Sequence, residues 1–200
     1  MDTLAKLKLR LKNREQVFMP SLPPEAAYAA KAYAGAGVDC MLIDAEHSPV
    51  GIETLRRALA ACRAADLPAI VRVPDAFYAF ISRTLDAGAD GIMVPRVESL
   101  AQVEIAVSSS KFPPVGRKGC GGPGIFRPGE SVSDFNRNRV LFIQIESPAG
   151  IDLLPDMLGR YGGQIDGVIV GPADLSIALG IPLEFENPLL ADEIRRLIGV

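Results

Sequence analysis

Short hydrophobic runs recur along the chain, and each is followed by Gly, Pro or charged residues and then by a segment with helical spacing. The runs are rich in Val and Ile and apolar on both faces, as in strands that helices cover on one side and a core covers on the other. They predict strands at Val17–Pro20, Cys40–Asp44, Ala69–Val73, Gly91–Pro95, Val140–Glu146 and Asp166–Gly171.

The segments between these runs are amphipathic. Leu55, Leu59 and Cys62, for example, fall on one face of a helix over Ile52–Ala65. Met1–Arg14 alternates Leu with Lys and Arg and predicts an opening helix over the end of a barrel. Alternation of strands and helices specifies a parallel sheet with right-handed crossovers. Further helices are predicted at Pro24–Ala34, Ala76–Ala87, Leu100–Ser109, Leu153–Arg160 and Leu189–Ile198.

The predicted strands change abruptly from apolar to polar at their carboxyl ends, and the unusual chemical groups follow there. In a (β/α)8 barrel this edge carries the active site. A doubly wound sheet places its ligands at the same edge, so the pattern locates a site without choosing between the two folds. A weak repeat, a Gly followed by Asp, precedes three of the strands at Gly35–Asp39, Gly88–Asp90 and Gly163–Asp166.

Composition narrows the class of protein. The chain has 200 residues, 48% of them hydrophobic, which is enough for one domain over residues 1–200 and excludes a disordered polar chain. With 21 basic and 24 acidic residues the net charge is −3, so we expect no nucleic-acid partner. The sequence has no run of ~20 apolar residues, so we expect no membrane span. The three cysteines form no CxxC pair, which indicates a reducing compartment with the cytoplasm as the default.

A Gly-rich segment, Gly116–Gly129, interrupts the alternation. Its composition suits a flexible linker. Because it lies between two core strands, we interpret it instead as a shaped active-site loop that offers backbone N–H groups and Arg117 or Arg127.

Two carboxylates follow neighbouring strands. Glu146 ends one strand, and Asp174 comes shortly after the next. Adjacent parallel strands lie ~4.8 Å apart, so both side chains can converge on one cation. The nearby ligands are oxygens and His47 is the sole His, which disfavours zinc and favours Mg²⁺ or Mn²⁺. The alternative is a helix cap for Asp174 and a salt bridge for Glu146, and spacing alone does not decide between them.

His47 and Arg72 also follow strand ends. An imidazole is the natural acid or base near neutral pH, and its place beside Asp44 and Glu46 favours catalysis over an ordinary packed or exposed histidine. Arg72 ends an apolar run, where an arginine is costly to bury unless it faces an anion, and its planar guanidinium suits a carboxylate or enolate. Its alternative is an ion pair with a nearby acidic side chain (Asp44, Glu46 or Asp75).

Several kinds of chemistry are disfavoured by what the sequence lacks. No lysine ends a clear core strand, which argues against an imine-forming aldolase. The motifs GxGxxG after the first strand, GxxxxGK[ST] and GxSxG are absent, which argues against dinucleotide oxidoreductases, P-loop enzymes and serine hydrolases.

Five segments in chain order resemble the signature segments of the HpcH/HpaI aldolase family: Ile43–Pro49, Val71–Pro74, Ile92–Pro95, Gln144–Glu146 and Val170–Ser176. The resemblance covers about residues 15 to 198. It implies a TIM barrel of metal-dependent pyruvate aldolases, usually hexameric. The family includes 2,4-dihydroxyhept-2-ene-1,7-dioate aldolase, 2-keto-3-deoxy sugar-acid aldolases and macrophomate synthase.

The resemblance also implies roles for individual residues. Glu146 and Asp174 would hold Mg²⁺ or Mn²⁺, which the pyruvoyl half of an oxo-acid substrate would chelate. The backbone around Ala173 and Asp174 would receive the substrate carboxylate, with Gln144 nearby. Arg72 would stabilise the enolate oxygen, where negative charge develops.

Two further roles follow from the same resemblance. His47, oriented by Asp44, would be the base in retro-aldol cleavage, and Asp86 would reach the histidine of a neighbouring subunit. The expected activity is that of a class II aldolase, a carbon–carbon lyase that cleaves a 4-hydroxy-2-oxo acid to pyruvate and an aldehyde through a metal-bound enolate. The alternatives are a macrophomate synthase-like oxaloacetate decarboxylation and a catalytically inactive, truncated family member.

The chain is shorter than a complete barrel of this kind, which has roughly 250 residues. Six strands are predicted, and the last predicted helix follows the sixth. We therefore expect a TIM barrel truncated after the sixth βα unit.

Overall fold

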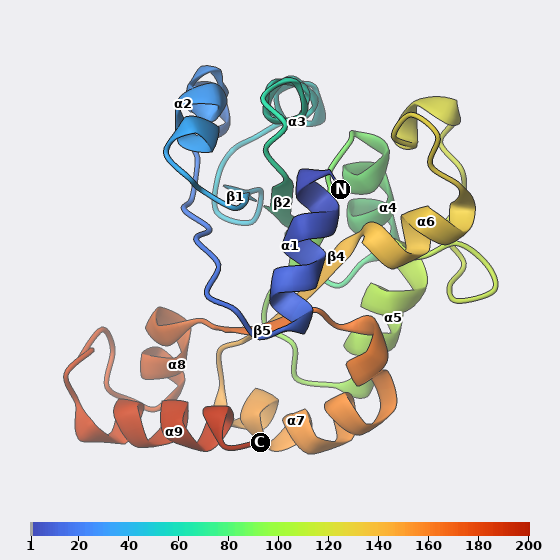
Figure 1. Cartoon of the computed structure of the whole chain (residues 1–200). Helices are drawn as coiled ribbons and strands as arrows, with labels where there is room; N and C mark the ends of the chain where they lie inside the picture. Colours follow the sequence, from blue (N-terminus) through green and yellow to red (C-terminus); the bar gives the residue numbers. More distant parts are fainter. Residues whose placement is uncertain (1) are drawn as a thin grey trace.

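Residues 2–200 are described by a computed structural model (Figure 1). In this part of the chain five strands form one parallel sheet in the order β1-β2-β3-β4-β5. The predicted parallel α/β fold is confirmed, with strands slightly shorter than expected. They are β1 (Met41–Asp44), β2 (Ala69–Arg72), β3 (Gly91–Val94), β4 (Val140–Ile145) and β5 (Gly167–Val170).

Helices connect the strands and cover one face of the sheet (Figure 1). The α-helices are α1 (Thr3–Lys12), α2 (Ala30–Gly35), α3 (Ile52–Ala64), α4 (Tyr78–Asp86), α5 (Leu100–Ser110), α6 (Val132–Asn138), α7 (Pro148–Tyr161), α8 (Pro172–Ala178) and α9 (Pro188–Ile198). Three short 3₁₀ segments are η1 (Pro24–Ala29), η2 (Pro123–Ile125) and η3 (Gly162–Gln164). Each helix within residues 2–200 is too short or too polar to cross a bilayer.

The first predicted strand, Val17–Pro20, does not become a strand of the sheet. The chain there runs beside β1 and forms a single parallel bridge between Ser21 and Leu42. The N–H of Leu42 donates to the carbonyl of Pro20 at 2.9 Å, and the N–H of Leu22 donates to the carbonyl of Leu42 at 2.8 Å. Pro20 has no N–H of its own, which limits further pairing along this edge.

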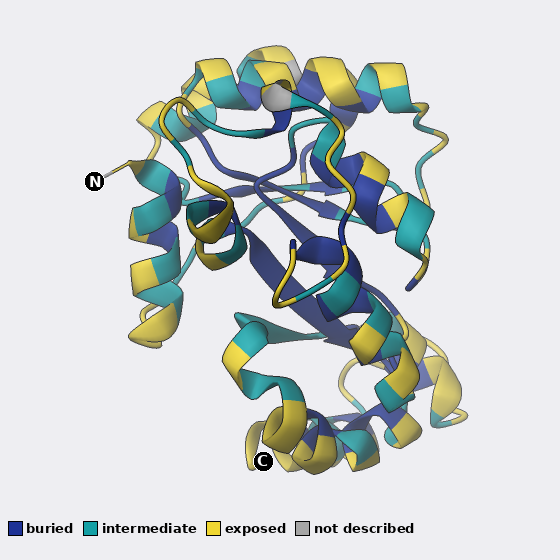
Figure 2. Ribbon diagram, turned by 90° about the vertical axis from the view of Figure 1, so that its right-hand side faces the viewer, coloured by how far each residue is buried: buried dark blue, intermediate teal, exposed yellow. Residues whose placement is uncertain are grey.

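Alternation of side chains creates two cores on opposite faces of the sheet. Figure 2 shows β2, β3 and β4 largely buried beneath half-exposed helices, whereas β5 is of intermediate exposure. The outer face packs against the connecting helices. On the inner face, Leu4 and Leu7 of α1 pack against residues that include Cys40 and Val140, at the amino ends of β1 and β4. The predicted opening helix therefore closes the amino-terminal end of the inner core, and the carboxyl end is left for polar groups.

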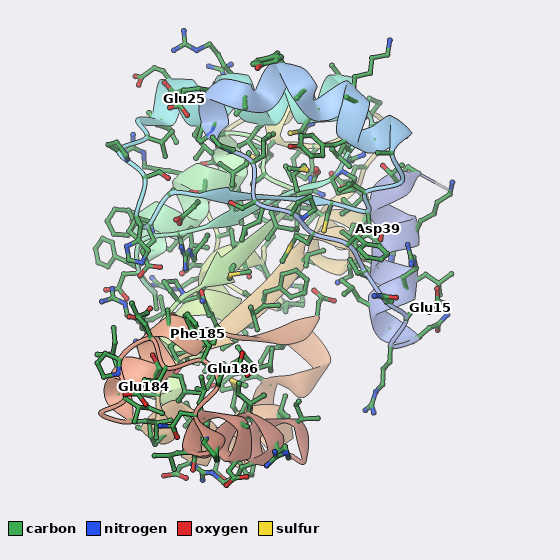
Figure 3. The ribbon with its side chains drawn as sticks, turned by 90° about the vertical axis from the view of Figure 1, so that its left-hand side faces the viewer. Glu15, Glu25, Asp39, Glu184, Phe185 and Glu186 are labelled. Carbon is green, nitrogen blue, oxygen red and sulfur yellow. The ribbon has the colours of Figure 1, made fainter. Side chains whose placement is uncertain are left out.

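Ion pairs attach α1 to the segment before β1. Arg10 pairs with Asp39 and with Glu15. Figure 3 shows Glu15 and Asp39 on the side of α1, whereas Glu184, Phe185 and Glu186, between α8 and α9, lie at the other end of the molecule.

Helix α7 begins at Pro148, earlier than the predicted Leu153. The hydroxyl of Ser147 accepts the N–H of Gly150 at 3.2 Å and caps the helix. Proline is favourable in the first turn because its missing N–H has no partner there. The cap follows Glu146 directly and so fixes the backbone just after this residue.

Candidate active site at the carboxyl edge of the sheet

Four polar side chains share the inner face at the carboxyl edge of the sheet. Asp44 and Arg72 are register partners at the ends of β1 and β2. Gln144 and Glu146 are two residues apart at the end of β4, so they point to the same face. Period-two alternation and parallel register thus bring together residues as far apart in sequence as Asp44 and Glu146.

Arg72 is held in a fixed orientation by Asp44. Its Nε donates to Oδ1 at 2.9 Å and its Nη2 to Oδ2 at 2.7 Å, which makes a bidentate ion pair. Burial opposes ionisation of Asp44, but the hydrogen bonds and charge of Arg72, together with the backbone N–H groups of Glu46 and His47, outweigh burial and lower the pKa of Asp44 below its ordinary value. The remaining Nη1 of Arg72 lies 3.5 Å from Oε1 of Gln144, on the side of Glu146.

Glu46 lies at the centre of the site, where its carboxylate is close to Arg72, Arg96 and His47. Its side chain is 6% exposed. Its Oε1 is 3.2 Å from Nε of Arg96, and its Oε2 is 3.4 Å from Nε of Arg72. Among the described residues Oε2 has no hydrogen-bond partner despite its burial. In the sequence, the position of Glu46 between Asp44 and His47, directly after a predicted strand, already indicates a residue of the site.

His47 follows β1 with its side chain 64% exposed, and its Nε2 is 3.6 Å from Oε2 of Glu46. Asp44, expected to orient this imidazole, is occupied otherwise. Its carboxylate accepts hydrogen bonds from Arg72 and from the backbone N–H groups of Glu46 and His47. The structure corrects the prediction on this point, because the side chain of Asp44 points along the sheet toward its register partner and holds the His47 loop only through the backbone.

Glu146 and Asp174 lie close together at the carboxyl edge of the sheet. The two side chains lie close enough for the charge of Asp174 to act on the Glu146 carboxylate. Burial raises the pKa of Glu146 to about 7, and the neighbouring charges of Asp174 and Glu46 add to this increase. Oε1 of Glu146 accepts the backbone N–H of Arg96 at 3.1 Å, and Oε2 accepts Nε2 of Gln144 at 3.1 Å.

Gly171 provides the space that the Glu146 carboxylate occupies. A Cβ on Gly171 would lie 2.1 Å from Oε2 of Glu146, so this close approach requires glycine. Asp174 lies in the first turn of α8, whose N-cap is Gly171. The alternative interpretation of Asp174 as the helix cap is therefore not observed. Ala173 lies in the same turn, and its carbonyl accepts the hydroxyl of Ser176 at 2.6 Å.

The donor set fits a hard divalent cation. Two adjacent carboxylates repel each other, and a divalent ion between Glu146 and Asp174 would remove this repulsion. Residues 2–200 contain no group of three or more Asp, Glu, His or Cys side chains arranged as a metal site. The chain thus offers two oxygen ligands, which suits Mg²⁺ because this ion commonly keeps waters and binds substrate oxygens.

Asp86 and the Gly-rich loop lie elsewhere. Asp86 ends α4 and pairs with the buried ammonium of Lys118. A Cβ on Gly121 would lie 2.6 Å from Cγ of Asp86, so the loop packs directly on this carboxylate. Arg127 pairs with Asp90, just before β3. The expectation of an active-site loop within this chain is wrong, because the loop connects α5 to α6 ahead of β4 and so lies toward the amino edge of the sheet.

A parallel sheet with acidic and basic side chains at its carboxyl edge is the arrangement of TIM-barrel enzymes. Residues 15–198 match the HpcH/HpaI aldolase/citrate lyase family. The chain is 34% identical over 178 residues to the hydroxypyruvate/pyruvate aldolase of Roseobacter denitrificans, covering 86% of this chain and 69% of that protein. It is 32% identical over 197 residues to the 2-keto-3-deoxy-L-rhamnonate aldolase of Escherichia coli K12, covering 96% of this chain and 71% of that protein.

A solved structure supports the same family. An HpcH/HpaI aldolase/citrate lyase family protein from Burkholderia cenocepacia J2315 superposes with a TM-score of 0.86 at 30% identity, covering 97% of this chain and 79% of that chain. The chain belongs to the HpcH/HpaI aldolase/citrate lyase family, as its five signature segments predict. The two curated relatives are aldolases, so membership supports an aldolase, or lyase, function.

Proposed function

We propose that the chain is a class II aldolase, a divalent-metal-dependent carbon–carbon lyase that cleaves a 4-hydroxy-2-oxo acid to pyruvate and an aldehyde. The observation that carries the proposal is the convergence of Glu146 and Asp174 beside the guanidinium of Arg72. The aldolase relatives support the same class of reaction.

Glu146 and Asp174 would hold Mg²⁺ or Mn²⁺, and the ion, when bound, draws electron density toward the keto oxygen of the substrate. The backbone at Ala173 and Asp174, with Gln144 beside it, receives the substrate carboxylate. Nη1 of Arg72 is the edge of the guanidinium that the bidentate ion pair leaves free. It donates to the keto oxygen as negative charge develops there.

Cleavage breaks the bond between C3 and C4. His47, exposed at the edge of the site, accepts the proton of the C4 hydroxyl as the aldehyde forms, and the electron pair of the broken bond passes into the enolate. The proton held by His47 then passes to C3 of the enolate, directly or through water, which completes pyruvate and regenerates the neutral imidazole. Within this chain the carboxylate of Asp86 pairs with Lys118 and does not approach His47. The predicted contact of Asp86 with a histidine therefore requires a homo-oligomer, in which a second copy of the chain supplies the imidazole.

Release of pyruvate from several 4-hydroxy-2-oxo acids and from oxaloacetate, followed with lactate dehydrogenase and NADH, tests the proposal. We expect EDTA to stop release and Mg²⁺ or Mn²⁺ to restore it. Glu146→Gln and Asp174→Asn should each lower kcat/KM roughly 100-fold or more, because each removes one of two protein ligands. Asp156→Asn, at an exposed carboxylate of α7, is the matched control.

Turnover that EDTA does not affect, or full activity of either variant, would contradict the metal-dependent mechanism. Pyruvate formed from oxaloacetate, and from no hydroxy-oxo acid, would identify a decarboxylase instead of an aldolase.

A further inference from the structure

Arg96 occupies an unusual place beside the predicted metal ligands. It follows β3 at the carboxyl edge of the sheet, and its backbone N–H donates to Oε1 of Glu146 at 3.1 Å. Its side chain extends across the mouth of the site, where Nε lies 3.2 Å from Glu46 and Nη2 lies 3.5 Å from the carbonyl of Pro74.

The backbone of Arg96 is held in a conformation that favours glycine or asparagine, with φ of 49°. Three hydrogen bonds hold it there. Besides the bond to Glu146, its carbonyl accepts Nε2 of Gln102 at 3.1 Å, and the next N–H, of Val97, donates to the carbonyl of Gln144 at 3.3 Å. The Cα is thus fixed relative to the site, and only the long side chain is free to adjust.

The charge of Arg96 is only partly compensated. Its side chain is 60% exposed, whereas that of Arg72 is 17% exposed and bound on two nitrogens by Asp44. Glu46, the ion-pair partner of Arg96, is shared with Arg72 and His47. Nη1 of Arg96 has no hydrogen-bond partner within residues 2–200. A guanidinium edge that faces solvent over a substrate site is suited to a carboxylate, which it binds through two parallel hydrogen bonds.

We propose that Arg96 determines substrate specificity by binding a carboxylate on the aldehyde-derived half of the substrate. The inference rests on the proposed function, which places the pyruvoyl half at Glu146 and Asp174. The substrate class is then a 4-hydroxy-2-oxo diacid, and its aldehyde product carries an acid group. Arg96 does not take part in bond cleavage.

Binding of unreactive ligands tests this assignment without any need for turnover. 2-Oxoglutarate and 2-oxopentanoate share the pyruvoyl half and differ in the distal carboxylate, and neither has a C4 hydroxyl. In the presence of Mn²⁺, calorimetry of the wild-type chain should show at least about tenfold tighter binding of 2-oxoglutarate, the usual effect of a charge-assisted hydrogen bond. Arg96→Asn, which suits the left-handed backbone, should bind both ligands about equally. Arg57→Gln, at an exposed arginine of α3, should keep the wild-type preference.

Addition of pyruvate to glyoxylate and to glycolaldehyde gives the corresponding kinetic comparison. The wild-type chain should prefer glyoxylate, Arg96→Asn should lose about tenfold or more of kcat/KM for glyoxylate alone, and Arg96→Lys should keep part of the preference. Equal losses for both aldehydes, or equal binding of both oxo acids by the wild-type chain, would overturn the assignment. Absence of carbon–carbon bond formation with every aldehyde, while 2-oxoglutarate is still preferred, would overturn the proposed function and leave Arg96 as a carboxylate-binding residue.

Discussion

Replacement of Gly171 by Ala changes the geometry of the two carboxylates without changing their chemistry. The new Cβ would lie 2.1 Å from Oε2 of Glu146 and 2.6 Å from its Cδ and Cγ, where ordinary contacts begin at 3.4 Å. Gly171 has φ of −100°, which any residue adopts, so the effect is steric. The carboxylate has to move by more than about 1 Å to accommodate the methyl group.

The structure sets the magnitude of the effect. The Glu146 carboxylate is held by the N–H of Arg96 and by Gln144, and a shift of this size breaks at least one of these bonds. Metal–ligand distances tolerate only about 0.2 Å, and a misplacement of about 1 Å at a reacting centre costs roughly 100-fold in rate. We expect Gly171→Ala to lower kcat/KM about 100-fold and Mn²⁺ affinity at least about tenfold. The free energy of unfolding should fall by only about 1–2 kcal/mol, the value of a buried hydrogen bond.

Three measurements check this prediction: Mn²⁺ titration followed by electron paramagnetic resonance, the pyruvate-release assay, and urea denaturation. Gly159→Ala on α7 is the control, because its Cβ meets nothing within 4 Å. Wild-type Mn²⁺ affinity and activity in Gly171→Ala would refute the reasoning. A fall in the free energy of unfolding large enough to account for the lost activity would refute it too, because the steric effect would then not be confined to the carboxylate.

Three further predictions follow from other contacts. Arg72→Lys should lower kcat roughly 100-fold with a smaller change in KM. An ammonium has one nitrogen, so it cannot bind Asp44 through two nitrogens and also reach the keto oxygen. An effect on KM alone would argue against this role. Glu130→Gln should destabilise the fold by about 3–5 kcal/mol in urea denaturation, since it leaves the buried Arg139 without its bidentate partner; a change below about 1 kcal/mol would contradict this. Burial lowers the pKa of Lys111 from 10.5 in the unfolded chain to about 7 in the folded chain. Between these two pH values the unfolded chain binds one more proton than the folded chain. The free energy of unfolding therefore rises with pH by up to about 1.4 kcal/mol per pH unit because of this group. Lys111→Met should flatten that rise between pH 7 and 8.5, and parallel stability curves would rule it out.

Most of the fold follows from local patterns. The apolar runs that became β1 to β5, and the Gly and Asp before several of them, are short-range features that specify strands, turns and helices independently of the rest of the chain. Glu146 and Asp174 were identifiable for the same reason, because a polar group directly after a buried strand of a parallel sheet has only one edge at which to lie.

Other features depend on contacts between distant segments. The run Val17–Pro20 has the composition of a strand, but its pairing with β1 is limited by a proline without an N–H. The Gly-rich loop has the composition of an active-site loop, yet it packs on Asp86 at the side of α4. Pro20 is visible in the sequence, but which edge the run meets, and what the Gly-rich loop packs on, depend on the partner that each segment contacts.

The chain's own sequence predicted the strands and helices of a parallel α/β fold, the edge that carries the polar groups, and Glu146 and Asp174 as candidate metal ligands at that edge. Only the folded chain assigned partners: Asp44 to Arg72, Glu46 to Arg96 and His47, and the empty side of Gly171 to the carboxylate of Glu146. The physical reason is that alternation and spacing are properties of neighbouring residues, whereas a side chain's partner is set by strand register and loop path, which arise from packing over the whole sheet.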